Sequence, residues 1–99
     1  MNRKQTFSKI NLFLRSKGAK KVAIFGSYAI GKQKKNSDID ILVNFNDSKS
    51  IFEIVSIQDE LGDLLNKKID LVTEKSVSPY KIDKIKKEMV ILWKMIIFT

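Results

Sequence analysis

Apolar residues recur every three to four positions between about Thr6 and Lys17, the spacing of one face of a helix. The residues of this face are Phe7, Ile10, Phe13 and Leu14. Gly18 follows directly, and glycine commonly ends a helix because it tolerates a positive φ. We therefore predict an amphipathic helix here that packs on a sheet.

Three short apolar segments have the pattern of strands. They are Lys20–Phe25, the segment from Asp38 to Val43, and Ile69–Thr73. Between the first two we expect a short helical turn at Tyr28–Gly31 and a polar turn at Lys32–Asn36. Tyr28 could stack on a base, but we favour an interpretation in which it is at least partly buried in the core.

Two further helices are predicted downstream. The first begins after a capping serine, Ser48 or Ser50, and runs to about Asn66. Its apolar positions are Ile54, Ile57, Leu61, Leu64 and Leu65. The second begins at Ser78–Pro79, with serine as the cap and proline in the first turn, and ends near Glu88.

The run Met89–Phe98 is too apolar for a free surface. Periodicity does not decide between a longer helix and a strand, and we expect a short strand through Trp93. The remaining tail either packs on the chain's own core or binds a partner, because exposed apolar patches usually mark interfaces.

Together these elements predict an α/β domain of the α+β kind, in which helices flank a small mixed β-sheet. The helix that ends near Asn66 would cross over from the second strand to the third. No internal repeat, linker or low-complexity segment divides the chain, so we expect one domain over residues 1–99.

The composition excludes several classes of site. The chain has no cysteine and no histidine, which rules out disulfides, thiolate or imidazole metal ligands and an imidazole base. Any general base would therefore be a carboxylate. No segment has the roughly 18 to 20 apolar residues of a membrane span, nor the apolar run of a signal peptide, so we expect a cytoplasmic protein that does not enter membranes.

The net charge of +8 is unevenly distributed. Residues 1–37 contain ten Lys or Arg and no acid, whereas the rest of the chain has eleven acids and nine lysines. The first part is therefore +10 and the second −2. A positive lobe beside acidic groups would attract a nucleoside triphosphate, a nucleic acid or an acidic protein face. For any single lysine, a solvated surface role is equally compatible with the sequence.

The second strand contains two aspartates two residues apart. Side chains alternate along a strand, so Asp38 and Asp40 share one face while Ile39, Ile41 and Val43 point into the core. Two carboxylates on one face repel unless a cation lies between them. Mg²⁺ is the obvious candidate, because it favours carboxylate oxygens together with water and substrate phosphates.

The Gly26–Ser27 corner supplies a complementary feature. Gly26 lets the backbone turn sharply and lets a ligand approach closely, and the unpaired N–H groups that follow suit a phosphate. The hydroxyl of Ser27 adds a further donor. If the third strand pairs beside the second, Asp70 comes within reach of Asp38 and Asp40.

Gly26–Ser27, then Ser37-Asp38-Ile39-Asp40, then Asp70 on a later strand resembles the signature of the DNA polymerase beta-type nucleotidyltransferases. A chain this short is most similar to the minimal nucleotidyltransferases (MNT), the antitoxin halves of HEPN/MNT toxin–antitoxin pairs. The resemblance covers nearly the whole chain and implies a polymerase beta-like palm fold. One departure is Ile30, which stands where an arginine is common in the family.

The resemblance implies transfer of AMP from ATP to a hydroxyl, with release of pyrophosphate. Asp38, Asp40 and Asp70 would hold two Mg²⁺ ions, and Asp70 would also help to deprotonate the acceptor. Gly26 and Ser27 would anchor the β- and γ-phosphates. The implied acceptor is a tyrosine of a cognate HEPN toxin.

Two functions from different classes remain open at this stage. One is an Mg²⁺-dependent protein adenylyltransferase, and the other is an antitoxin that neutralises its toxin by binding alone. A homodimer and a complex with the toxin are both compatible with the sequence. We do not expect direct nucleic-acid binding, because no groove-reading helix or aromatic stacking platform is apparent.

Overall fold

The computed structural model describes residues 1–95. Its elements are α1 (Arg3–Ser16), β1 (Ala19–Phe25), the short 3₁₀ helix η1 (Gly26–Tyr28), β2 (Ile39–Phe45), α2 (Ile51–Leu65), β3 (Ile69–Thr73), the 3₁₀ helix η2 (Glu74–Ser76), α3 (Pro79–Glu88) and β4 (Val90–Lys94).

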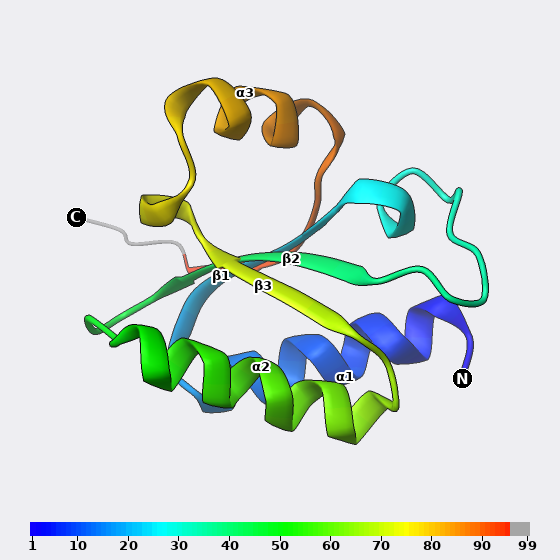
Figure 1. Ribbon diagram of the computed structural model, residues 1–99, viewed down its shortest axis with the longest axis horizontal. Coiled ribbons are helices and arrows are strands. Elements are labelled where there is room, and N and C mark those ends of the chain that lie inside the picture. Colours follow the sequence, from blue (N-terminus) through cyan, green and yellow to red (C-terminus); the bar gives the residue numbers. More distant parts are fainter. Residues whose placement is uncertain (96–99) are drawn as a thin grey trace.

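The four strands form one mixed sheet in the order β3-β2-β1-β4. Strand β1 is antiparallel to both β2 and β4, whereas β2 and β3 are parallel and are connected by α2. Helices α1 and α2 lie side by side on one face of the sheet, and α3 lies alone on the other (Figure 1). The predicted fold class, a small mixed sheet flanked by helices, is confirmed.

The main core lies between the sheet and the α1–α2 layer. Ile39, Ile41 and Val43 are completely buried there, as the alternation along β2 predicts. Ile10 and Leu14 of α1 and Leu61 of α2 are also fully buried. Leu64, another of the apolar positions of α2, is 52% exposed and lies outside this core.

A smaller core lies under α3, where Ile85 packs on Ala23 and Leu42. Phe25 and Ile82 pack at its border. Because the side chains of β2 alternate, this second face is also the face that carries Asp40. The small α3 core therefore holds a helix directly beside the predicted site.

Capping side chains explain where the helices begin. Asn2 and Gln5 form a capping box at α1, so this helix begins at Arg3, three residues before the predicted start. Ser50, rather than Ser48, caps α2, and Ser78 followed by Pro79 begins α3 as predicted. The short helical segment was misplaced: it occupies Gly26–Tyr28 and not Tyr28–Gly31, because the helical turn opens at the glycine itself.

The end of the described chain agrees with the predicted strand. Helix α3 ends at Glu88, and β4 pairs with β1 from Val90 onward. The last part of the apolar tail, residues 96–98, lies outside the described residues. None of the helices in residues 1–95 is long and apolar enough to cross a membrane.

One ion pair ties η2 to the centre of the sheet. The ammonium of Lys21, on β1, lies 2.7 Å from a carboxylate oxygen of Glu74, and the amide of Asn44 donates to the other oxygen. The two charged side chains are 11% and 21% exposed. The hydrogen bond from Lys21 is the main cause that lowers the pKa of Glu74.

Replacing Glu74 with glutamine should destabilise the fold by about 2 kcal/mol, because Lys21 would remain as a mostly buried, unpaired charge. Chemical denaturation measures this loss. Glu60→Gln is the matched control: it breaks a pair with Lys17 whose side chains are 35% and 51% exposed, and should cost less than about 0.5 kcal/mol.

The pH dependence of the Glu74→Gln effect has a definite sign. The folded-state pKa of Glu74 is lowered, so its stabilisation is complete above the ordinary glutamate pKa and is lost as pH falls through the lower folded value. The difference in unfolding free energy between the two proteins should therefore be constant near neutral pH and shrink in acid. A difference that grows in acid would contradict this assignment.

Candidate active site

Strand β1 ends at a sharp corner formed by Gly26. The φ of Gly26 is +70°, and a Cβ atom built on it would overlap the carboxylate of Asp40. The turn that follows is closed by hydrogen bonds from Ala29 N to Gly26 O at 3.1 Å and from Lys32 N to Ser27 O at 2.9 Å. Only a glycine therefore lets the corner and the carboxylate lie so close together.

The parallel pairing of β2 and β3 brings two of the predicted aspartates together. Asp40 and Asp70 are direct register partners, and both project from the α3 face of the sheet. On the other side of β2, Asp40 is opposite Phe25, the last residue of β1. Asp40 is partly buried and Asp70 is exposed, so the pair lies at an accessible edge of the α3 core.

The electrostatics of the pair are unfavourable when both groups are charged. Burial is the first cause that raises the pKa of Asp40, followed by the negative charges of Asp70 and Asp38 and a hydrogen bond with Asp70. The ammonium of Lys81, on α3, acts in the opposite direction. This carboxyl cluster is therefore short of positive charge.

Asp38 lies one residue before β2 and is turned toward a different neighbour. Its carboxylate is 3.8 Å from the ammonium of Lys68, which directly precedes β3. Both side chains are largely exposed, so the pair is weak and exchangeable. Across residues 1–95, no three acidic, histidine or cysteine side chains are gathered closely enough to hold a metal ion as they stand.

The donor chemistry nevertheless fits Mg²⁺. Asp40 and Asp70 offer hard carboxylate oxygens with unrelieved repulsion, and Asp38 is close enough to Asp40 to raise its pKa. The carboxylate of Asp38 contacts Lys68 and is not gathered with the other two.

Lys68 and Lys81 are the neighbours of the acids that sequence reasoning missed. Lys68 could have been found: if Ile69 pairs with Ile39 in a parallel register, the preceding residues Lys68 and Asp38 must also lie side by side. Lys81 had no such signal, because its position depends on how α3 packs on the second face.

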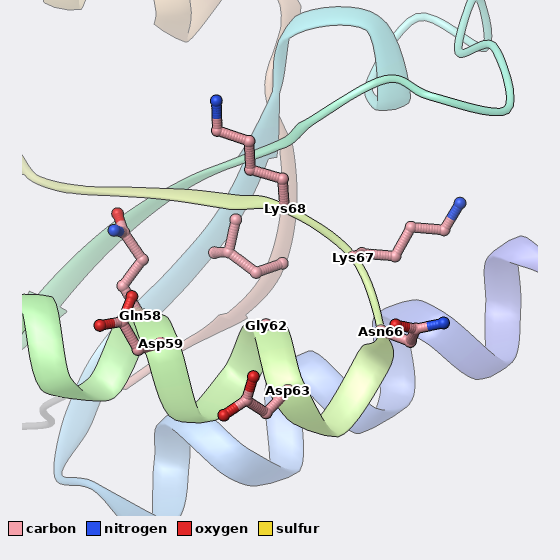
Figure 2. Close-up of a pocket in the computed structure, with 8 residues that line it drawn as sticks. Gln58, Asp59, Gly62, Asp63, Asn66, Lys67 and Lys68 are labelled. Atoms are coloured by element: carbon pink, nitrogen blue, oxygen red, sulfur yellow. The ribbon is translucent and has the colours of Figure 1, made fainter.

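A broad, mostly polar hollow of about 740 Å³ lies elsewhere on the surface, since none of Asp38, Asp40 and Asp70 lines it. It follows the edge of β3 above α2, and its rim includes Asp59, Asp63 and Lys68. Lys67 and Lys68 both point away from α2 (Figure 2). The hollow therefore follows α2 and the start of β3 and is not part of the predicted site.

Comparison with known proteins identifies the family. Residues 7–92 match the family described as "Nucleotidyltransferase domain". The chain belongs to this family of nucleotidyltransferase domains. A relative in Methanocaldococcus jannaschii, named "Putative protein adenylyltransferase", is 42% identical over 91% of this chain and 97% of its own length.

Solved structures agree with this assignment. A toxin–antitoxin complex with AMP-PNP contains a chain with a TM-score of 0.83 and 30% identity, over 90% of this chain and 73% of that one. A "putative minimal nucleotidyltransferase" has a TM-score of 0.72 and 28% identity over 89% of each chain. The resemblance to the minimal nucleotidyltransferases is therefore confirmed. Relatives in this family are named protein adenylyltransferases, and the first structure above is a chain of a toxin–antitoxin complex.

Proposed function

We propose that this nucleotidyltransferase domain transfers AMP from ATP to a hydroxyl of a partner protein, namely a tyrosine of a cognate HEPN toxin, and so acts as its antitoxin. The observation that carries the proposal is the pairing of Asp40 with Asp70 directly beside the Gly26 corner. The names of the relatives support the adenylyltransferase activity, and the toxin–antitoxin complex with an ATP analogue supports both partners.

The nucleotide would bind between the corner and the carboxylates. The backbone N–H groups after Gly26 and the hydroxyl of Ser27 would hold the β- and γ-phosphates. This leaves the α-phosphorus near Asp40. Asp38, Asp40 and Asp70 would hold the Mg²⁺ ions, which supply charge neutralisation of the attacking and leaving oxygens when bound.

The transfer itself needs only one proton acceptor from the chain. The acceptor hydroxyl loses its proton to Asp70 and forms a new bond to the α-phosphorus, while the bond from that phosphorus to pyrophosphate breaks. Asp70 suits this role because it is exposed at the open edge of the pair. With no histidine in the chain, a carboxylate is the base available at this site.

A second function is favoured by the position of Asp38. Its carboxylate contacts Lys68 and is not gathered with the other two, and Ile30 replaces a common family arginine. A chain with this geometry could neutralise its toxin by binding alone, with a weakened or lost activity. We rank it second because the carboxylate set itself is retained.

The two functions are separated by one labelling experiment. The purified chain is incubated with α-labelled ATP, Mg²⁺ and the cognate HEPN toxin, in parallel with an Asp38→Asn/Asp40→Asn variant. We expect label on the partner with the wild type only. Absence of label, together with equally tight complexes from both proteins, would establish the binding antitoxin instead.

A further inference from the structure

A small basic notch lies at the end of the sheet that carries the predicted site. It is a cavity of about 250 Å³, and four of its lining residues are cationic: Arg3, Lys34, Lys35 and Lys67. They come from the start of α1, from the polar turn before β2 and from the turn before β3. Three segments far apart in the sequence therefore place positive charge around one hollow.

Two of the four cations are held in place. The guanidinium of Arg3 donates to Tyr28 O at 3.2 and 3.1 Å and to Ala29 O at 3.4 Å, and it lies over the ring of Phe7. The ammonium of Lys67 donates to Lys35 O at 3.2 Å. Each group keeps further N–H donors for a ligand, so the notch is arranged before anything binds.

The charge in the notch is not compensated. None of the residues that line it is acidic, and none of its four cations forms a salt bridge within the described residues. An anionic group bound here would relieve the mutual repulsion of the four cations.

The notch adjoins the predicted active site on two sides. Arg3 braces the turn that follows Gly26–Ser27, and Lys67 is the sequence neighbour of Lys68, which contacts Asp38. A ligand in the notch would therefore lie next to the corner and the carboxylates, and not on them.

We propose that the notch binds carboxylate side chains of an acidic segment that flanks the acceptor hydroxyl of the partner protein. This rests on the proposed adenylyl transfer and adds a specificity determinant to it. Carboxylates fit the volume, and the Nη1 group of Arg3, which donates to neither Tyr28 O nor Ala29 O, can donate to one of them. A nucleic-acid strand fits less well, since the one aromatic residue in the lining, Tyr28, is 7% exposed and gives bases no face on which to stack.

Direct binding tests the proposal without relying on catalysis. A fluorescein-labelled peptide in which glutamates flank one tyrosine is titrated with the protein at physiological salt, with no ATP or Mg²⁺. A matched peptide has glutamines in place of the glutamates. The notch variant is Lys34→Gln/Lys35→Gln/Lys67→Gln; Arg3 is left intact because it braces the turn.

The control variant removes the same charge elsewhere. Lys75, Lys84 and Lys87 are exposed and lie outside the notch, and replacing all three with glutamine also lowers the net charge by three. We expect the notch variant to lose about tenfold in affinity for the acidic peptide and the control to lose less than about twofold. The single change Lys34→Gln removes no side-chain hydrogen bond and should lower the affinity for the acidic peptide about two- to threefold. It therefore tests the notch even if the triple variant does not fold.

Three outcomes would overturn the proposal. Equal losses in the notch and control variants would show a general charge effect. Binding of an oligoadenylate RNA, but not of the acidic peptide, with the same dependence on the notch would show a nucleic-acid site. A notch-dependent loss of ATP affinity would assign the notch to the triphosphate. A failure of adenylyl transfer alone would leave the peptide titration unaffected, so the two proposals fail separately.

Discussion

Asp40→Asn should abolish adenylyl transfer and at the same time raise the thermal stability of the metal-free protein. Asparagine keeps the shape of the side chain but removes the charge that would hold Mg²⁺, and loss of such charge stabilisation costs about a thousandfold in rate or more. The same loss of charge explains the gain in stability, because it removes a repulsion from the folded protein. Burial and the charges of Asp70 and Asp38 raise the pKa of Asp40, so its charged form is disfavoured in the fold.

Two measurements check this prediction together: label transfer from α-labelled ATP, and the melting temperature without Mg²⁺. We expect a rise of at most a few degrees, because solvent at this partly exposed carboxylate screens the repulsion. Asp83→Asn is the matched control, because Asp83 is an exposed acid on α3 outside the salt bridges of the described chain. Retained transfer, or a lower melting temperature, would show that Asp40 is an ordinary structural acid.

The pairing of the carboxylates could be predicted because it depends on two simple regularities. Alternation along β2 and β3 fixes which face Asp40 and Asp70 occupy, and a helix between two strands favours their parallel pairing side by side. The buried Ile39, Ile41 and Val43 follow from the same alternation. Alternation along the strands and the helix that connects them were therefore sufficient to predict that Asp40 and Asp70 lie together.

The features that could not be predicted depend on contacts between distant segments. Lys81 lies near Asp40 only because of how α3 packs on the second face of the sheet, and the basic notch combines residue 3 with residues 34, 35 and 67. Leu64 follows the helical spacing but is exposed, because spacing alone does not show how much of the helix surface the sheet covers. Spacing along the sequence carries none of this information.

The single domain, the nucleotide site, the Mg²⁺ ligands and the cytoplasmic location remain predictions. Among these, the nucleotide corner has the sharpest test, because the structure offers a pair of comparable glycines. Gly26 and Gly31 have nearly the same φ, +70° and +72°. They differ in their surroundings: a Cβ at Gly26 would overlap the carboxylate of Asp40, whereas one at Gly31 meets nothing within 4 Å.

Gly26→Ala should therefore destabilise the protein by about 3 kcal/mol and reduce transfer at least a hundredfold, because Asp40 must move for the methyl group to fit. Gly31→Ala carries only the backbone cost, about 1 kcal/mol, and should keep transfer within about threefold. Denaturation and initial rates of label transfer measure both. Since the backbone strain is shared, the difference between the two variants isolates the contact with Asp40. Equal effects on transfer would mean that the corner does not position this carboxylate.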